Sequence, residues 1–179
     1  MYYDLGYKPE DLLVKVSELM VATADDFDIE IDHCVPEVLR LLREKMKMDV
    51  VFVSEFLDGH RVLRQVDIEP QNALFAVGDS TPLEETWCQR VVDGRLPPYI
   101  PDVSKNIAAT ELEKNLPFDV GTFISTPIVL EGGEIYGTLC CLSFKSVESS
   151  DLTDLKRLQY TAQLTAVKID KHRAANKSK

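Results

Sequence analysis

Residues 121–144 constrain the fold most, because they form two apolar runs on either side of a short turn. The turn reads EGGE, at 131–134, and its length is typical of an antiparallel β-hairpin. Both runs, 121–130 and 135–144, are apolar at nearly every position, so both faces of their sheet should be covered. Gly137 interrupts the second run, where a missing side chain allows close approach of backbone or ligand.

Apolar residues at helical spacing are expected to form helices at both ends of the chain. One helix is predicted over residues 8–23 and a second over about 31–46, with Pro36 either inside it or at its start. A long final helix is predicted from Asp151 to about His172. Residues 173–179 are expected to form a disordered tail.

The middle of the chain predicts further strands and one helix. Dense β-branched and aromatic residues indicate strands at 49–57 and 61–68, the second lying near a sheet edge. A helix is expected from a cap at Ser80 or Thr81 to Gly94, followed by loops and short helices. Together these elements predict a single α+β domain. Its antiparallel sheet should carry the terminal helices on one face and the middle loops on the other.

Composition restricts the partners of the chain. Its 179 residues are enough for one domain with a sizeable core. A formal net charge of -10 disfavours contact with nucleic acid and with anionic membrane surfaces. No stretch reaches the roughly 20 apolar residues that span a bilayer, and the N-terminus does not resemble a secretion signal.

The four cysteines, at 34, 88, 140 and 141, do not form a disulfide framework. Cys140 and Cys141 are adjacent in a predicted strand and should point to opposite faces. Four free thiols in a cytoplasmic protein are therefore expected. The histidines and cysteines also lack paired ligand spacing, so no metal site is predicted.

Three segments resemble GAF domains, and the resemblance extends from about Ile31 to Ile169. They are FVSEF in the first strand, TWCQRVVDGRLPPYIPDVS in the helix and loop, and STPIVLEGGEIYGTLCCLS in the hairpin. The last two are similar to GAF sensors found beside diguanylate cyclase, cyclic-di-GMP phosphodiesterase and histidine kinase modules. Taken with the predicted helices, the resemblance divides the chain into an N-terminal helix and linker over 1–27, a GAF-like domain over 28–172 and the tail over 173–179. It implies the GAF-like fold described above, with the helix and loop covering a ligand pocket.

Several known GAF chemistries are disfavoured by these residues. Bilin-carrying GAF domains commonly have histidine after the attachment cysteine, whereas Gln89 follows Cys88. GAF reductases of free methionine sulfoxide use cysteines before a strand motif, and residues 102–122 contain none. Residues 113–119, EKNLPFD, share letters but not order with the signature of cyclic-nucleotide GAF domains. The cofactor stays unidentified and no catalytic residue is predicted.

Position in the predicted helix, loop and hairpin defines the candidate ligand-binding residues. Such a set is mostly apolar with a few polar anchors, as small-ligand pockets are. Each member is equally compatible with an ordinary core position, and the sequence does not decide which sheet face holds the pocket. The candidates are Trp87, Cys88, Val91, Tyr99, Asp102, Phe123, Ser125, Thr138 and Cys140.

Three functional hypotheses follow. The favoured one is a non-catalytic sensory module that binds a small molecule and transmits a conformational change through its terminal helices to a partner or a fused output domain. The second is a ligand-free dimerisation scaffold, which a closed, side-chain-filled interior would favour. The third is a thiol enzyme based on Cys88. A homodimer through residues 9–20 and 152–169 is also expected, because both segments have spare apolar surface.

Overall fold

A six-stranded antiparallel sheet forms the centre of the computed structural model, which describes residues 27–69 and 74–178. The strand order is β3-β2-β1-β6-β5-β4, so the strands of the predicted hairpin pair with each other and β1 pairs with β6. The strands are β1 (Val50–Leu57), β2 (His60–Ile68), β3 (Ser80–Pro82), β4 (Tyr99–Ile100), β5 (Phe123–Val129) and β6 (Ile135–Leu142).

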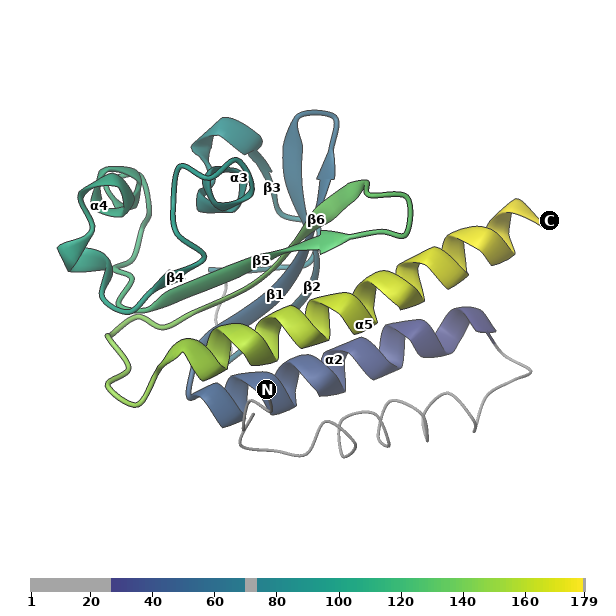
Figure 1. The fold of residues 1–179 in the computed structure, drawn as a ribbon, viewed down its shortest axis with the longest axis horizontal. Helices are drawn as coiled ribbons and strands as arrows, with labels where there is room; N and C mark the ends of the chain where they lie inside the picture. Colours follow the sequence, from purple (N-terminus) through teal and green to yellow (C-terminus); the bar gives the residue numbers. More distant parts are fainter. Residues whose placement is uncertain (1–26, 70–73, 179) are drawn as a thin grey trace.

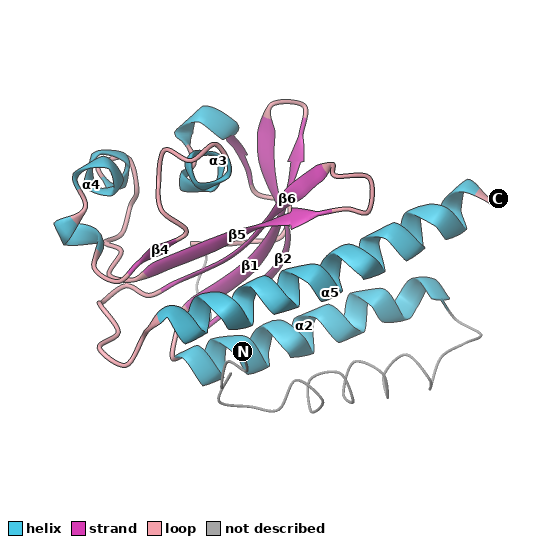
Figure 2. Cartoon of the chain, in the orientation of Figure 1, coloured by secondary structure: helices cyan, strands magenta, loops and turns pink. Residues whose placement is uncertain are grey.

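Each face of this sheet has its own cover (Figure 1). The long helices α2 (Phe27–Met46) and α5 (Leu152–Lys177) lie side by side over one face. The short helices α3 (Trp87–Val92) and α4 (Ile107–Glu113) lie with their loops over the other face (Figure 2). This arrangement confirms the predicted α+β fold.

Alternating residues of β5 supply the cores on the two faces. Ile124 and Ile128 are buried among residues of α2 and α5, whereas Phe123 packs on the side of α3. Ser125 is also fully buried, and Pro127 is half-buried. The prediction that both faces of this strand are covered is therefore confirmed over Phe123–Ile128, whereas Val129 at its end is 48% exposed.

Gly137 lies where β6 passes close to β1. A Cβ atom added at this position would lie 1.9 Å from the carbonyl oxygen of Ser54. The absence of a side chain at Gly137 thus allows β6 to lie close to β1. The sequence had indicated close approach of either backbone or ligand at this position, and the structure shows backbone.

The segment before α3 differs from the prediction. Residues 80–82 pair with β2 as a short strand, and a 3₁₀ turn follows at Leu83–Glu85. The predicted helix start at Ser80 or Thr81 is therefore wrong. Thr86 is the cap instead, because its side chain accepts a hydrogen bond from the backbone N–H of Gln89 at 3.2 Å.

The edge position of β2 is confirmed. The strand pairs with β1 along its whole length, whereas β3 covers only its first three residues, His60–Val62. The remainder of β2 therefore forms an edge of the sheet beyond the reach of β3.

The terminal helices are longer than predicted. Helix α2 begins at Phe27 and contains Pro36. Helix α5 continues through Lys177, so most of the expected tail is helical. Arg173 anchors this end: it pairs with Glu134 at 3.2 Å, and its guanidinium lies 5.5 Å from the ring centroid of Tyr136. The helix expected over 8–23 lies outside the described residues.

Candidate functional site

A pocket with a volume of about 110 Å³ lies between the sheet and the layer that contains α3 and α4. Aromatic and aliphatic side chains form most of its wall. Its lining consists of Phe52, Arg61, Phe75, Thr81, Glu85, Thr86, Trp87, Cys88, Leu112, Leu116, Phe118, Val120, Phe123 and Leu142. Small-ligand sites in proteins share this composition of apolar walls with few polar groups.

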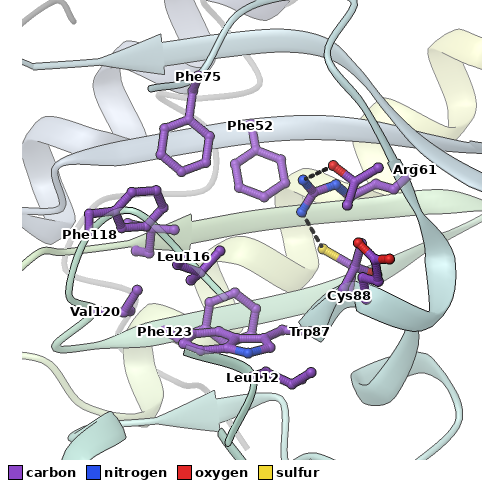
Figure 3. Close-up of a pocket in the computed structure, with 14 residues that line it drawn as sticks. Phe52, Arg61, Phe75, Trp87, Cys88, Leu112, Leu116, Phe118, Val120 and Phe123 are labelled. Carbon is purple, nitrogen blue, oxygen red and sulfur yellow. Dashed lines mark hydrogen bonds between the residues drawn. The ribbon is translucent and has the colours of Figure 1, made fainter. Parts of the chain in front are cut away.

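Five of the lining residues are aromatic, and they contact one another in two groups (Figure 3). Phe75 stacks on Phe52 with ring centroids 5.9 Å apart, and it also contacts Phe118 at 5.3 Å. Trp87 meets Phe123 edge-on at 4.9 Å. Such contacts fix the rings against one another, so the apolar wall is formed before any ligand arrives.

Arg61 provides the positive charge of the pocket. Its guanidinium lies 5.4 Å from the ring centroid of Phe52, and one terminal nitrogen donates to the Thr81 hydroxyl at 3.3 Å. The other points at the sulfur of Cys88, 3.9 Å away (Figure 3). Its Nε is buried and has no hydrogen-bond partner in the structure. A buried, unsatisfied donor on a cation is costly, and an acceptor from a ligand would remove that cost.

Cys88 contacts both Arg61 and a buried polar cluster that lies behind the pocket wall. The Cys88 sulfur lies 3.3 Å from the sulfur of Cys140 on β6. Cys140 also lies 2.9 Å from the hydroxyl of Ser125 and 3.2 Å from that of Thr138. The last cluster member, Ser54, exchanges a hydrogen bond with Thr138 at 2.8 Å.

This arrangement separates the acidities of the two thiols. A hydrogen bond from Cys140, helped by the charge of Arg61, lowers the pKa of Cys88 to about 6 against the opposing effect of burial. Burial, followed by the adjacent Cys88, raises the pKa of Cys140 well above its ordinary value. Negative charge is therefore favoured on Cys88, the sulfur nearer to Arg61, over Cys140.

The predicted site residues divide by position. Trp87, Cys88 and Phe123 line the pocket. Ser125, Thr138 and Cys140 are brought together beneath Cys88, in the polar cluster behind the wall. Val91 packs against the core on the same face without lining the pocket.

Tyr99 and Asp102 lie elsewhere. Tyr99 packs against the core under α2 and α5, on the opposite face of the sheet. Asp102 caps the 3₁₀ turn Val103–Lys105, where its carboxylate accepts from the Ser104 hydroxyl at 2.6 Å. Its pKa is lowered mainly by that hydrogen bond.

Other reactive groups stay apart from the pocket. The ring of His60 hydrogen-bonds the Asp58 carbonyl at 3.0 Å. Within residues 27–69 and 74–178, no group of three or more His, Cys, Asp or Glu side chains could hold a metal ion. No helix in that part of the chain is long and apolar enough to cross a membrane.

Sequence reasoning missed Arg61 and most of the aromatic wall. Arg61 and Leu63 are two residues apart on β2 and therefore point to the same face of the sheet. This alternation could have predicted that Arg61 lies beside the core. Phe75 and Phe118 lie in irregular segments without periodicity, and only tertiary structure brings them to Phe52.

Comparison with known proteins identifies the fold. The family model described as GAF domain matches residues 30–169. A phycoerythrobilin-bound GAF domain from a cyanobacterial phytochrome superposes with a TM-score of 0.71 at 14% identity, covering 98% of this chain and 100% of that one. The GAF domain of an Acinetobacter phosphoenolpyruvate-protein phosphotransferase gives 0.69 at 15% identity, with 99% of both chains covered.

An enzyme of the same fold is also similar. The type II free methionine-R-sulfoxide reductase from Thermoplasma acidophilum superposes with a TM-score of 0.62 at 21% identity, covering 82% of this chain and 96% of that one. No curated protein sequence matches the chain. These structural identities establish the fold alone, whereas the family model spans most of the sequence. With its sheet, its two covers and this match, the chain belongs to the GAF domain family.

Proposed function

We propose that this GAF domain is a non-catalytic sensory module that binds a small, largely apolar molecule with an anionic end. The observation that carries this proposal is the aromatic pocket that contains Arg61, whose buried Nε has no partner. Among the described residues, Arg61 has a thiol, a hydroxyl and an aromatic ring as neighbours but no ion pair with a carboxylate. A ligand carboxylate would supply that missing acceptor and could pair with two guanidinium N–H groups.

The size of the pocket restricts the ligand. A volume of about 110 Å³ is below the roughly 300 Å³ at which pockets for drug-sized ligands begin. It is comparable with an engineered apolar cavity of about 150 Å³ that binds benzene. A small monocarboxylate with an aromatic or branched aliphatic body fits this description, whereas a tetrapyrrole does not.

The sheet offers a path from the pocket to the terminal helices. Phe123 lines the pocket, and its neighbour Ile124 packs under the helices α2 and α5. On β6, Cys140 likewise packs on the pocket side of the sheet, and its neighbour Cys141 packs under the helices. Because the sheet is a single layer, displacement of a pocket residue shifts the surface on which both helices rest. We infer that the helices pass this shift to a partner or a fused output domain of the cyclic-di-GMP or histidine kinase type, in the cytoplasm.

Binding of a graded series of monocarboxylates tests the proposal. Isothermal calorimetry with acetate, isobutyrate, benzoate and phenylacetate, each paired with its neutral amide, should show saturable binding of at least one acid and weaker binding of its amide. Arg61→Gln should weaken that binding by about tenfold or more, since a hydrogen bond to a charged group contributes roughly 1.5–3 kcal/mol. Arg64→Gln is the matched control, because Arg64 is on the same strand but pairs with Glu55 outside the pocket.

A second measurement separates a sensor from a scaffold. Native mass spectrometry of the protein purified from its own host should detect a retained small molecule, and Arg61→Gln should reduce its occupancy. Hydrogen exchange should then slow in α5 when the ligand is added. Absence of both a retained molecule and acid-selective binding would favour the ligand-free dimerisation scaffold.

A further inference from the structure

The strongest unassigned chemistry in the described chain is the pair of thiols behind the pocket wall. Cys88 on α3 and Cys140 on β6 are 52 residues apart in sequence, yet their sulfurs lie 3.3 Å apart. Both are free thiols in the structure. A disulfide bond needs a separation of about 2.05 Å, so the two sulfurs have to approach by about 1.3 Å to form one.

The two sulfurs differ in their access to small molecules. Both residues are buried, 1% and 0% exposed respectively, but Cys88 lines the pocket and Cys140 does not. A small oxidant that enters the pocket therefore meets Cys88 first. Cys140, held by Ser125 and Thr138, lies directly behind it.

The surroundings also favour one thiolate over the other. Arg61 lies 3.9 Å from the Cys88 sulfur, and Cys140 can donate its S–H to that sulfur. Both contacts stabilise negative charge on Cys88, and the thiolate is the nucleophilic form of cysteine. The protonated Cys140 stays available as the second thiol.

We propose that Cys88 and Cys140 form a thiol–disulfide switch that small hydroperoxides oxidise, with Cys88 as the reacting thiol and Cys140 as the resolving thiol. The inference does not depend on the ligand proposed above. The reaction is stoichiometric and consumes one hydroperoxide for each disulfide formed.

The oxidation balances in two steps. The Cys88 thiolate attacks one peroxide oxygen, and the S–O bond forms as the O–O bond breaks. The leaving alkoxide takes a proton from water to give an alcohol; from hydrogen peroxide the leaving group is hydroxide and the product is water. The Cys140 thiol then attacks the Cys88 sulfenic acid. The S–S bond forms as the S–O bond breaks, and the Cys140 proton passes to the leaving hydroxide, which departs as water. Two thiols are oxidised by two electrons and the hydroperoxide is reduced.

The disulfide would change the pocket in two ways. It would tie α3 to β6, and it would remove the thiolate that faces Arg61. An uncharged disulfide leaves the guanidinium with the Thr81 hydroxyl and the Phe52 ring as its remaining neighbours. The oxidised protein should therefore attract an anion into the pocket more strongly than the reduced one.

Peroxide treatment of the full chain tests the switch. Reduced protein at pH 7 is exposed to hydrogen peroxide, quenched with an alkylating reagent and analysed by intact mass and peptide mapping without reductant. We expect loss of two hydrogen masses and a peptide that joins Cys88 to Cys140. Cys140→Ser should accumulate a Cys88 sulfenic acid that dimedone labels.

Cys141→Ser is the matched control. Cys141 neighbours Cys140 on β6 but packs on the opposite face of the sheet, so this variant should form the same disulfide at the wild-type rate. Cys88→Ser should leave Cys140 unoxidised. Retention of both thiols in the folded wild-type protein, or equal loss of Cys140 thiol in Cys88→Ser, would overturn the proposal; the wild-type result is decisive even where a variant does not fold.

Discussion

Arg61 shows how one residue gives the pocket its chemical character. Without it, the pocket wall would be almost entirely apolar, with Glu85 exposed among the lining residues. Its charge is partly balanced by the Phe52 ring and by the Cys88 sulfur rather than by a carboxylate. Arg61 is half-buried, and its buried Nε lacks a partner, which carries a desolvation cost. Perturbed charged groups in a cleft are candidates for a functional site.

The acidity of Cys88 is a direct test of this electrostatic arrangement. Thiolate absorbance near 240 nm should show one group titrating at about pH 6, because hydrogen bonding from Cys140 is the largest cause of its lowered pKa. The groups facing Cys88 are Cys140, Thr138 and Arg61, with Glu85 also lining the pocket.

Cys140→Ala should raise the midpoint of the Cys88 titration, and Arg61→Gln should raise it less. Cys141→Ala should leave it in place; an unchanged midpoint in Cys140→Ala would show that the hydrogen bond from Cys140 does not lower the pKa of Cys88.

The same pKa sets how stability depends on pH. The pKa of Cys88 is depressed in the folded protein from an ordinary 9.0 to about 6. Its ionised form therefore stabilises the fold most above pH 9, and this contribution is lost as the pH falls through 6. Urea midpoints should decrease between pH 8 and 6, and Cys88→Ser should reduce that decrease. A slope identical in the two proteins would show that Cys88 is not the titrating group.

At the scale of elements, the apolar pattern predicted those helices and strands whose buried residues recur at a regular spacing. The β5–β6 hairpin and the two long helices were found because each buries a regular set of side chains. The start of α3 was missed because Pro82 suits a helix N-terminus as well as a short edge strand. β4 was missed because two residues carry no detectable period. Pocket residues such as Phe75 and Phe118 depend on loop packing, which one sequence does not encode locally.

The contact between β1 and β6 makes a prediction about Gly137. Gly137→Ala places a Cβ 1.9 Å from the Ser54 carbonyl oxygen, in a strand pair that has no flexible side chain to move aside. We expect a loss of about 3 kcal/mol in the free energy of unfolding, at the upper end of the usual cost of overpacking, measured by urea denaturation.

Gly132→Ala is the matched control for this substitution. Gly132 lies in the turn of the same hairpin, and a Cβ there has nothing within 4 Å. Its stability should stay within about 0.5 kcal/mol of the wild type, as surface substitutions usually do. Equal effects of the two substitutions would show that the strand contact is not what requires glycine.

At the scale of the whole molecule, the sheet separates a small aromatic layer, which contains the pocket, from a large helical layer (Figure 1). The pocket, the thiol pair and Arg61 all lie on one side. The other side consists of helices that bury their stripes on the sheet and reach beyond it toward the end of α5. We infer that the first layer receives a chemical signal and that the second presents it to other proteins.

Homodimerisation of this helical layer is the remaining prediction. Much of the apolar stripe of α5 packs against the sheet, since Leu155, Leu158 and Ala162 are buried in the core between them. Leu152 and Val167 stay 63% and 52% exposed, and they lie about 60° apart around the helix, so they form one outward side. Residues 9–20, the other half of the predicted interface, lie outside the described residues.

Light scattering at micromolar concentration should therefore give twice the chain mass of 20.2 kDa. Val167→Glu should shift the mass toward that of one chain, because it places a charge in an apolar interface at a position exposed in the monomer. Ile107→Glu is the matched control, since Ile107 is 81% exposed on α4 at the opposite face of the sheet. It should leave the mass unchanged. A wild-type mass near 20.2 kDa would mean that the terminal helices satisfy each other within one chain, and the signal would then have to pass to a different protein.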